Sequence, residues 1–171
     1  MTEEELLIAV ANTAHGEHDE FADAASVRAW WRGLGQPTTS EAAADVAALR
    51  GLRVLIRGLA LRNNGIEPDL SPAAGLDALA LRLDLGGTLS LRPEVPGDLA
   101  RDIAAATVAA LLRATARPGW PRVKACRGND CRWVFVDGSR NSSRRWCAMA
   151  DCGNRAKVAA FRSRHRSPAA R

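Results

Sequence analysis

All four cysteines of this 171-residue chain lie between positions 126 and 152. They form two pairs with the same internal spacing: four residues separate Cys126 from Cys131 and Cys147 from Cys152, and fifteen residues separate the two pairs. Two short loops that each present two sulfurs supply the tetrahedral ligands of a structural zinc site, and thiolates suit this metal. Two disulfides or four unrelated buried thiols are the alternatives, and a reducing compartment favours the metal. The spacing therefore predicts one structural Zn2+ ion per chain, with no open coordination position for catalysis.

The sequence around the cysteines indicates a small α+β module. The segment RWVFV is predicted to be a strand, DGSRNSS a turn, and RRW a strand that returns to the metal. GNRAKVAAFRSRHR is predicted to be a helix whose first turn lies beside the metal. A knuckle, a hairpin and a helix in this order make a treble-clef-like zinc finger, in which metal binding supplies much of the folding energy. Its expected hydrophobic cover is Trp133, Phe135, Trp146 and Phe161.

The two parts of the chain carry opposite net charge. Residues 1–121 contain 11 Lys and Arg against 16 Asp and Glu, a net charge of −5, and residues 122–171 contain 13 against 3, a net charge of +10. Together they give the +5 of the whole chain. A basic segment beside an acidic one favours a nucleic acid or another acidic surface as partner, and a solvated basic tail is the alternative.

The N-terminal part is predicted to be mainly helical. Leu49, Leu52 and Ile56 recur at steps of three and four residues, so they line one face of a helix. The expected helices start at a capping box formed by Thr2 and Glu5, at Ser26, at about Ser40, at Ser71 and at about Asp98. The helix that starts near Ser40 is expected to end at about Arg62, and the last to end at about Arg117.

One β-hairpin is predicted in the segment LALRLDLGGTLSLRP, where leucines alternate with polar residues. Residues paired across a hairpin point to the same face, so a three-residue, glycine-containing turn places leucine opposite leucine. The boundary falls at residues 118–121, because two prolines and a glycine interrupt the helical pattern there. We therefore expect a mainly α domain with one hairpin over residues 1–120 and the zinc finger with its basic helix over residues 121–171.

The tetrapeptide Cys152-Gly153-Asn154-Arg155, which follows the other three cysteines, resembles the signature of the CGNR zinc-finger family. In that family the finger usually follows a domain called ABATE, which is described as a stress-induced transcription regulator. The first 120 residues are similar to that domain in layout, with Asn12-Thr13 after an apolar run, the Trp30-Trp31 segment, and a hairpin before a long helix. The resemblance implies a zinc-dependent, DNA-binding transcriptional regulator.

Candidate nucleic-acid contacts are the cations of the finger. Arg155, Arg162 and Arg166 share one face of the predicted helix, which could enter a major groove, while Val158 and Phe161 would point inward. The turn arginines could contact phosphates. The full candidate set is Arg140, Arg144, Arg145, Arg155, Lys157, Arg162 and Arg166. Gly153 is expected to let the helix start tightly beside the metal. Asn154 and Arg155 could either contact DNA or orient the ligand loop by hydrogen bonds around the metal.

In the N-terminal domain, Asn12, Trp30 and Asn63 are candidates for a ligand pocket, although asparagines more often cap helices and tryptophans more often fill cores. We interpret His15 and His18 as exposed loop side chains rather than metal ligands. No catalytic constellation is evident, so we do not expect an enzyme. No stretch approaches the ~18 apolar residues of a membrane span.

We therefore expect a cytoplasmic protein whose partner is double-stranded DNA, with a small-molecule effector and a homodimer as open possibilities. The alternative is a zinc-stabilised protein-interaction module, or an RNA-binding module, without sequence-specific DNA recognition.

Overall fold

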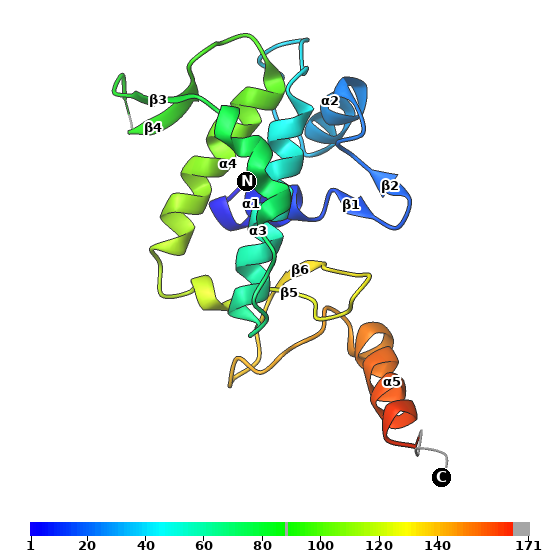
Figure 1. The fold of residues 1–171 in the computed structure, drawn as a ribbon. Helices are drawn as coiled ribbons and strands as arrows, with labels where there is room; N and C mark the ends of the chain where they lie inside the picture. Colours follow the sequence, from blue (N-terminus) through cyan, green and yellow to red (C-terminus); the bar gives the residue numbers. More distant parts are fainter. Residues whose placement is uncertain (88, 166–171) are drawn as a thin grey trace.

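The computed structural model describes residues 1–87 and 89–165. It is α-rich, with small β-hairpins. Three helices form the centre of the molecule: α1 (Glu3–Ala11), α3 (Val46–Asn63) and α4 (Leu99–Thr115). The helix α2 (Ala24–Gly33) lies at one end of this bundle, and α5 (Asn154–His165) projects from the other end (Figure 1). In the described ranges, none of the helices combines the length and apolar character needed to span a membrane.

The core lies between these three helices. The predicted stripe on α3 is confirmed, because Leu49, Leu52 and Ile56 are fully buried. They pack in one cluster with Leu7 of α1 and Ile103 of α4. Burial of each such side chain stabilises the fold by about 1.5–3 kcal/mol relative to exposure. The periodic apolar residues of α3 are therefore the ones that form the core.

Helix caps explain where the helices begin. The predicted capping box is present: the Thr2 hydroxyl accepts from the Glu5 N–H, and the Glu5 carboxylate accepts from the Thr2 N–H. The predicted cap Asp98 is also present, since its carboxylate accepts from the Arg101 N–H. The prediction of Ser26 as a cap is wrong, because Asp23 accepts from the Ser26 N–H and α2 starts at residue 24.

The helix α3 begins at Val46, later than the predicted start near Ser40. The second carboxylate oxygen of Asp98 accepts from the N–H groups of Ala44, at 2.7 Å, and Asp45, at 3.3 Å. The Leu99 N–H donates to the Ala42 carbonyl at 2.7 Å. Residues 40–45 are therefore used to cover the N-terminus of α4, and this contact competes with helix formation.

The predicted hairpin is formed by β3 (Leu81–Asp84) and β4 (Ser90–Pro93). Its register is as predicted, with Leu83 opposite Leu91. The last paired residues are Asp84 and Ser90, so the connection is longer than three residues; it includes residue 88, which lies outside the described ranges. The short helix η1 (Ser71–Ala78) precedes it, at the predicted Ser71.

A second hairpin, absent from the sequence prediction, consists of β1 (Ala14–His15) and β2 (His18–Asp19). Arginines of α3 hold it to the bundle. Arg53 pairs with Asp19 at 2.5 Å. Arg57 donates to the carbonyl oxygens of Ala11, the last residue of α1, and Ala14, the first residue of β1. The prediction of a loop for this polar segment is thus wrong, since His15 and His18 are paired strand residues, although both are exposed as predicted.

A third hairpin begins the finger. After the short turn η2 (Trp120–Arg122), β5 (Val123–Ala125) pairs with β6 (Val134–Val136). The predicted pairing of RWVFV with RRW is wrong, because β6 pairs with β5 and residues 144–146 form no strand. Val123, Ala125 and Val134 belong to the same buried cluster as α1, α3 and α4. The division into residues 1–120 and 121–171 stays a prediction, and the first hairpin of the finger is packed in the helical core.

Candidate metal centre and nucleic-acid interface

The four cysteines lie together at the N-terminal end of α5. Their sulfur atoms all lie within 4.8 Å of one another, with 3.6 Å between the sulfurs of Cys131 and Cys147 and 3.8 Å between those of Cys147 and Cys152. These separations are far longer than a disulfide bond of about 2.05 Å. Four sulfurs placed about 2.3 Å from a tetrahedral zinc ion lie roughly 3.8 Å apart, so the geometry fits zinc. The cluster could bind one zinc ion and leaves it no open position.

The first two ligands lie on a knuckle between β5 and β6. The Cys126 N–H donates to the Trp133 carbonyl at 2.8 Å, which closes the loop, and the Gly128 N–H points at the Cys126 sulfur at 3.4 Å. A Cβ atom added at Gly128 would lie 3.2 Å from the Cβ of Cys131 and 3.5 Å from the sulfur of Cys152. A side chain at this position would therefore crowd Cys131, which would have to move by a few tenths of an ångström to accept it.

The last ligand joins the metal centre to α5. Cys152 lies in the π-helical turn η3 (Met149–Gly153), which runs directly into α5. The Arg155 guanidinium donates to the Cys152 sulfur at 3.1 Å. Burial alone would raise the pKa of Cys152, but the hydrogen bonds from Arg155 and the neighbouring thiols lower it below its usual value. This contact favours the thiolate, which is the form that binds zinc.

The other signature residues are placed around the same turn. The Asn154 side chain donates to the Ala150 carbonyl at 2.9 Å and so closes the π-helical turn. Gly153 is buried, and an added Cβ would lie 2.3 Å from the Met149 sulfur. Both residues therefore shape the backbone that carries Cys152.

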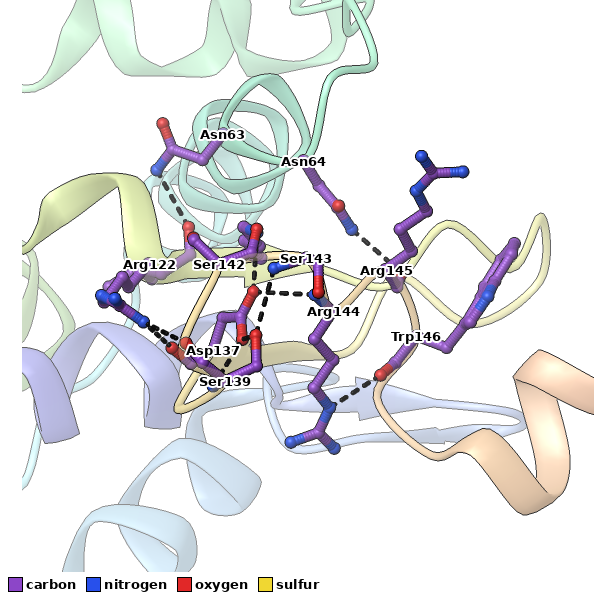
Figure 2. A network of polar contacts seen from close by, with 12 residues as sticks. Asn63, Asn64, Arg122, Asp137, Ser139, Ser142, Ser143, Arg144, Arg145 and Trp146 are labelled. Atoms are coloured by element: carbon purple, nitrogen blue, oxygen red, sulfur yellow. Dashed lines mark hydrogen bonds and ion pairs between the residues drawn. The ribbon is translucent and has the colours of Figure 1, made fainter.

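A network of polar contacts around Asp137 holds the loop between the cysteine pairs (Figure 2), and a buried ion pair with Lys124 is part of it. The Lys124 ammonium lies 2.7 Å from a carboxylate oxygen of Asp137, and both side chains are buried. The Asp137 carboxylate also accepts from the Ser139 N–H at 2.9 Å and from the Arg144 N–H at 2.9 Å. Burial alone would raise the pKa of Asp137, but these donors hold it well below its usual range. No local pattern predicts this pair, because the knuckle separates the two residues along the chain.

Arg144, a candidate DNA contact, makes several contacts within the finger. Its guanidinium lies over the Phe135 ring, 4.7 Å from the centroid, and donates to the Trp146 carbonyl at 3.0 Å and to the Cys147 carbonyl. Figure 2 shows it folded back toward Trp146. The Arg145 carbonyl accepts from the Arg127 N–H at 3.1 Å, while its side chain is exposed. Arg140 is exposed as well.

The asparagines singled out for a ligand pocket instead join the helical body to the finger. Asn12 and Val134 share two hydrogen bonds, and Asn63 donates to the Trp120 and Val123 carbonyls at 2.9 Å. Asn64 donates to the Ala125 carbonyl at 2.7 Å and the Arg145 carbonyl at 3.0 Å. The third pocket candidate, Trp30, packs edge-on against Phe21. Each of the three predicted pocket residues thus makes a structural contact of its own.

The basic helix is exposed along its described length, since α5 has no buried residue. The prediction that Val158 and Phe161 point inward is wrong: they are 47% and 55% exposed, because α5 leaves the body instead of packing on it. In the finger, Phe135 and Trp146 do cover the cysteines, whereas Trp133 lies edge-on against His15. Arg166 lies outside the described residues.

One face of α5 borders a cleft of about 780 Å³ beside the metal centre. Arg155 and Arg162, predicted to share a face, both line it, together with Val158. His15, at the tip of the β1–β2 hairpin, lines the same cleft. The body therefore contributes a residue to the surroundings of the basic helix, which the sequence did not predict.

Four clustered sulfurs at the N-terminal end of a basic helix define a structural zinc-binding module. Residues 122–165 match the family model of the CGNR zinc finger, a match that contains all four cysteines. No curated protein matches the chain.

Proposed function

We propose that this protein is a zinc-dependent, DNA-binding transcriptional regulator whose finger contacts double-stranded DNA. The observation that carries the proposal is the placement of α5. Its N-terminus follows the last cysteine, and none of its residues is buried, so Lys157, Arg162 and Arg164 face solvent, while Arg155 is held at the Cys152 sulfur. A helix fits the major groove, and arginine can pair with guanine edges there.

The surroundings of α5 support the same function. Arg140 and Arg145, on the loop after β6, are exposed and could contact phosphates while α5 contacts bases. Arg144 would contribute mainly by holding the Cys147 loop, given its contacts to Trp146 and Cys147. The acidic charge of residues 1–121 would keep the body away from the duplex and so help to orient the finger.

In this proposal the helical body is an ABATE-like regulatory domain, and stress-induced regulation is its expected setting. The three asparagines that bond to the finger backbone, Asn12, Asn63 and Asn64, would transmit changes in the body to the metal centre. A homodimer would match symmetric DNA sites.

Selection from random DNA duplexes tests the proposal. Zinc-loaded full-length protein at near-physiological salt is expected to enrich one motif, and chelator is expected to abolish the enrichment. Binding should also weaken steeply with salt, because each neutralised phosphate releases counterions. Equal enrichment with and without zinc, or no enrichment at all, would reject the proposal.

The exposed apolar side chains of α5 favour a second candidate, a zinc-stabilised protein-interaction module. Val158 and Phe161 are about half exposed and could pack against a partner protein. Replacing Val158 with Ser separates the two functions, since it should leave DNA affinity nearly unchanged but weaken an apolar protein contact. RNA binding commonly uses exposed aromatics for stacking, and Phe161, which stacks on His165, is the residue to test for it.

A further inference from the structure

Arg132 follows the ligand Cys131 and has an unusual backbone conformation, with φ of 55°. This left-handed region disfavours residues with a Cβ atom, and glycine adopts it at little cost. The chain therefore places an arginine where the backbone alone favours glycine.

The Arg132 side chain reaches back toward the helical body. Its Nη1 atom is buried and has no hydrogen-bond partner among the described residues. A buried donor without a partner is costly, and a charged one more so. Arg132 lines a cavity of about 300 Å³ between α3 and residues 66–69. The same cavity is lined by Arg57 and by four apolar side chains: Val54, Leu61, Ile66 and Pro68.

Two carboxylates, those of Glu67 and Asp69, also line this cavity, and both already have partners. Glu67 pairs with Arg62 at 2.7 Å, and Asp69 accepts from the Ser71 N–H at 2.9 Å. Arg57 uses its Nε and one Nη atom for the Ala11 and Ala14 carbonyls.

Two arginines, Arg57 and Arg132, and the two carboxylates line the cavity. Arg62, which lies outside the lining, already pairs with Glu67, so one surplus positive charge is left. This balance suits a singly charged anion better than a phosphate dianion.

We propose that this cavity binds a small monocarboxylate with a short apolar body. The carboxylate pairs with Arg132 and with the free edge of Arg57, and the apolar body packs on Val54 and Leu61. The volume lies at the small end of ligand pockets. Because Arg132 is joined to Cys131, the ligand binds beside the metal knuckle. The inference stands independently of DNA binding.

Titration calorimetry of the zinc-loaded full-length protein tests this site. The probes are 3-methylbutanoate, its neutral amide and inorganic phosphate. The carboxylate is expected to bind at least about tenfold more tightly than either of the others, because only it gives the guanidinium a charge-assisted partner of matching size. Equal binding of carboxylate and amide would overturn the proposal, and so would tighter binding of phosphate.

Variants locate the binding. Arg132→Gly suits the left-handed backbone and removes the guanidinium, so affinity should fall about tenfold or more. Arg132→Asn, which also tolerates positive φ, serves if the glycine variant folds poorly. Arg82→Ala removes an exposed arginine on β3 and should bind like the wild type. Wild-type affinity in a folded Arg132 variant would overturn the assignment.

Discussion

The side-chain amide of Asn12, at the C-terminal end of α1, pairs with the backbone of Val134 in β6: its Nδ2 donates to the carbonyl oxygen at 2.9 Å, and its Oδ1 accepts from the N–H at 2.8 Å. The contact joins residues 122 positions apart. It satisfies both main-chain groups of Val134, as a neighbouring strand would. A single side chain thus extends the finger hairpin onto the helical body.

Asn12→Ala should therefore destabilise the whole protein. Removal of the amide leaves the partly buried N–H and carbonyl of Val134 without partners. Each group left unsatisfied costs about 1–3 kcal/mol. Urea unfolding should show a lower free energy of unfolding in a single transition. Asn141→Ala, at an exposed position in the loop after β6, is the matched control and should change stability by less than about 0.5 kcal/mol. Equal stability of the two variants would contradict the structural role of Asn12.

Zinc removal should affect the helical body as well as the finger. Val123, Ala125 and Val134 pack in the main core, so loss of the metal that ties the knuckle between β5 and β6 loosens that core. Chelator, or Cys147→Ser, is expected to lower the melting temperature by roughly 5 °C or more. Metal analysis should give one zinc in the wild type. Chelator should have no further effect on a Cys147→Ser protein that lacks zinc. A melting temperature independent of zinc would show that the body does not depend on the finger.

Asp137→Asn should be strongly destabilising, because it leaves the Lys124 charge buried without its partner. Breaking a buried ion pair costs about 3–5 kcal/mol. Replacing both residues, with Lys124→Met added, should recover part of that loss. Urea unfolding at neutral pH measures all three proteins. A double variant less stable than Asp137→Asn alone would contradict the expected coupling.

The same pair predicts a pH dependence. The folded-state pKa of Asp137 is lowered, so its contribution is complete above the unfolded pKa of about 3.9 and is lost as the pH falls below that value toward the folded pKa. The wild type should therefore lose more stability between pH 7 and pH 3 than Asp137→Asn does. Parallel curves of stability against pH for the two proteins would show that Asp137 is not the source of the acid sensitivity.

Arg144→Ala and Arg145→Ala should differ, although the residues are neighbours. Arg144 holds the Cys147 loop and covers Phe135, so its loss should weaken zinc retention and lower stability by about 1–2 kcal/mol. Arg145 has an exposed side chain, so its loss should reduce duplex affinity and lower the salt slope by about 1 while zinc content stays at one. Competition with a zinc-binding dye and salt-dependent duplex binding measure the two effects. Equal zinc retention in the two variants would remove the structural role of Arg144.

Local sequence signals predicted local structure well. The capping box at Thr2, the cap at Asp98 and the leucine register of the β3–β4 hairpin each depend on residues a few positions apart, and each is present. The four cysteines could be predicted as zinc ligands because each pair is closely spaced, and the equal spacing of the two pairs indicates one shared metal site.

Contacts between distant segments left no such signal. An asparagine that bonds to a backbone carbonyl elsewhere in the chain looks like any helix-capping asparagine, so the roles of Asn12 and Asn63 could not be read from the sequence. The start of α3 was missed because Asp98, more than fifty positions away, binds the preceding N–H groups. Val158 and Phe161 fit an inward face, but the direction in which α5 leaves the metal centre decides their exposure.

The free position of α5 has a consequence for how such a protein can diverge. Because none of its described residues is buried, substitutions along its exposed positions face little selection from folding. The cysteines and the contacts of Asn12, Asn63 and Asn64 carry the structural constraints instead. The surface of the helix could therefore change from one lineage to another, and acquire new recognition, while the rest of the molecule stays as it is.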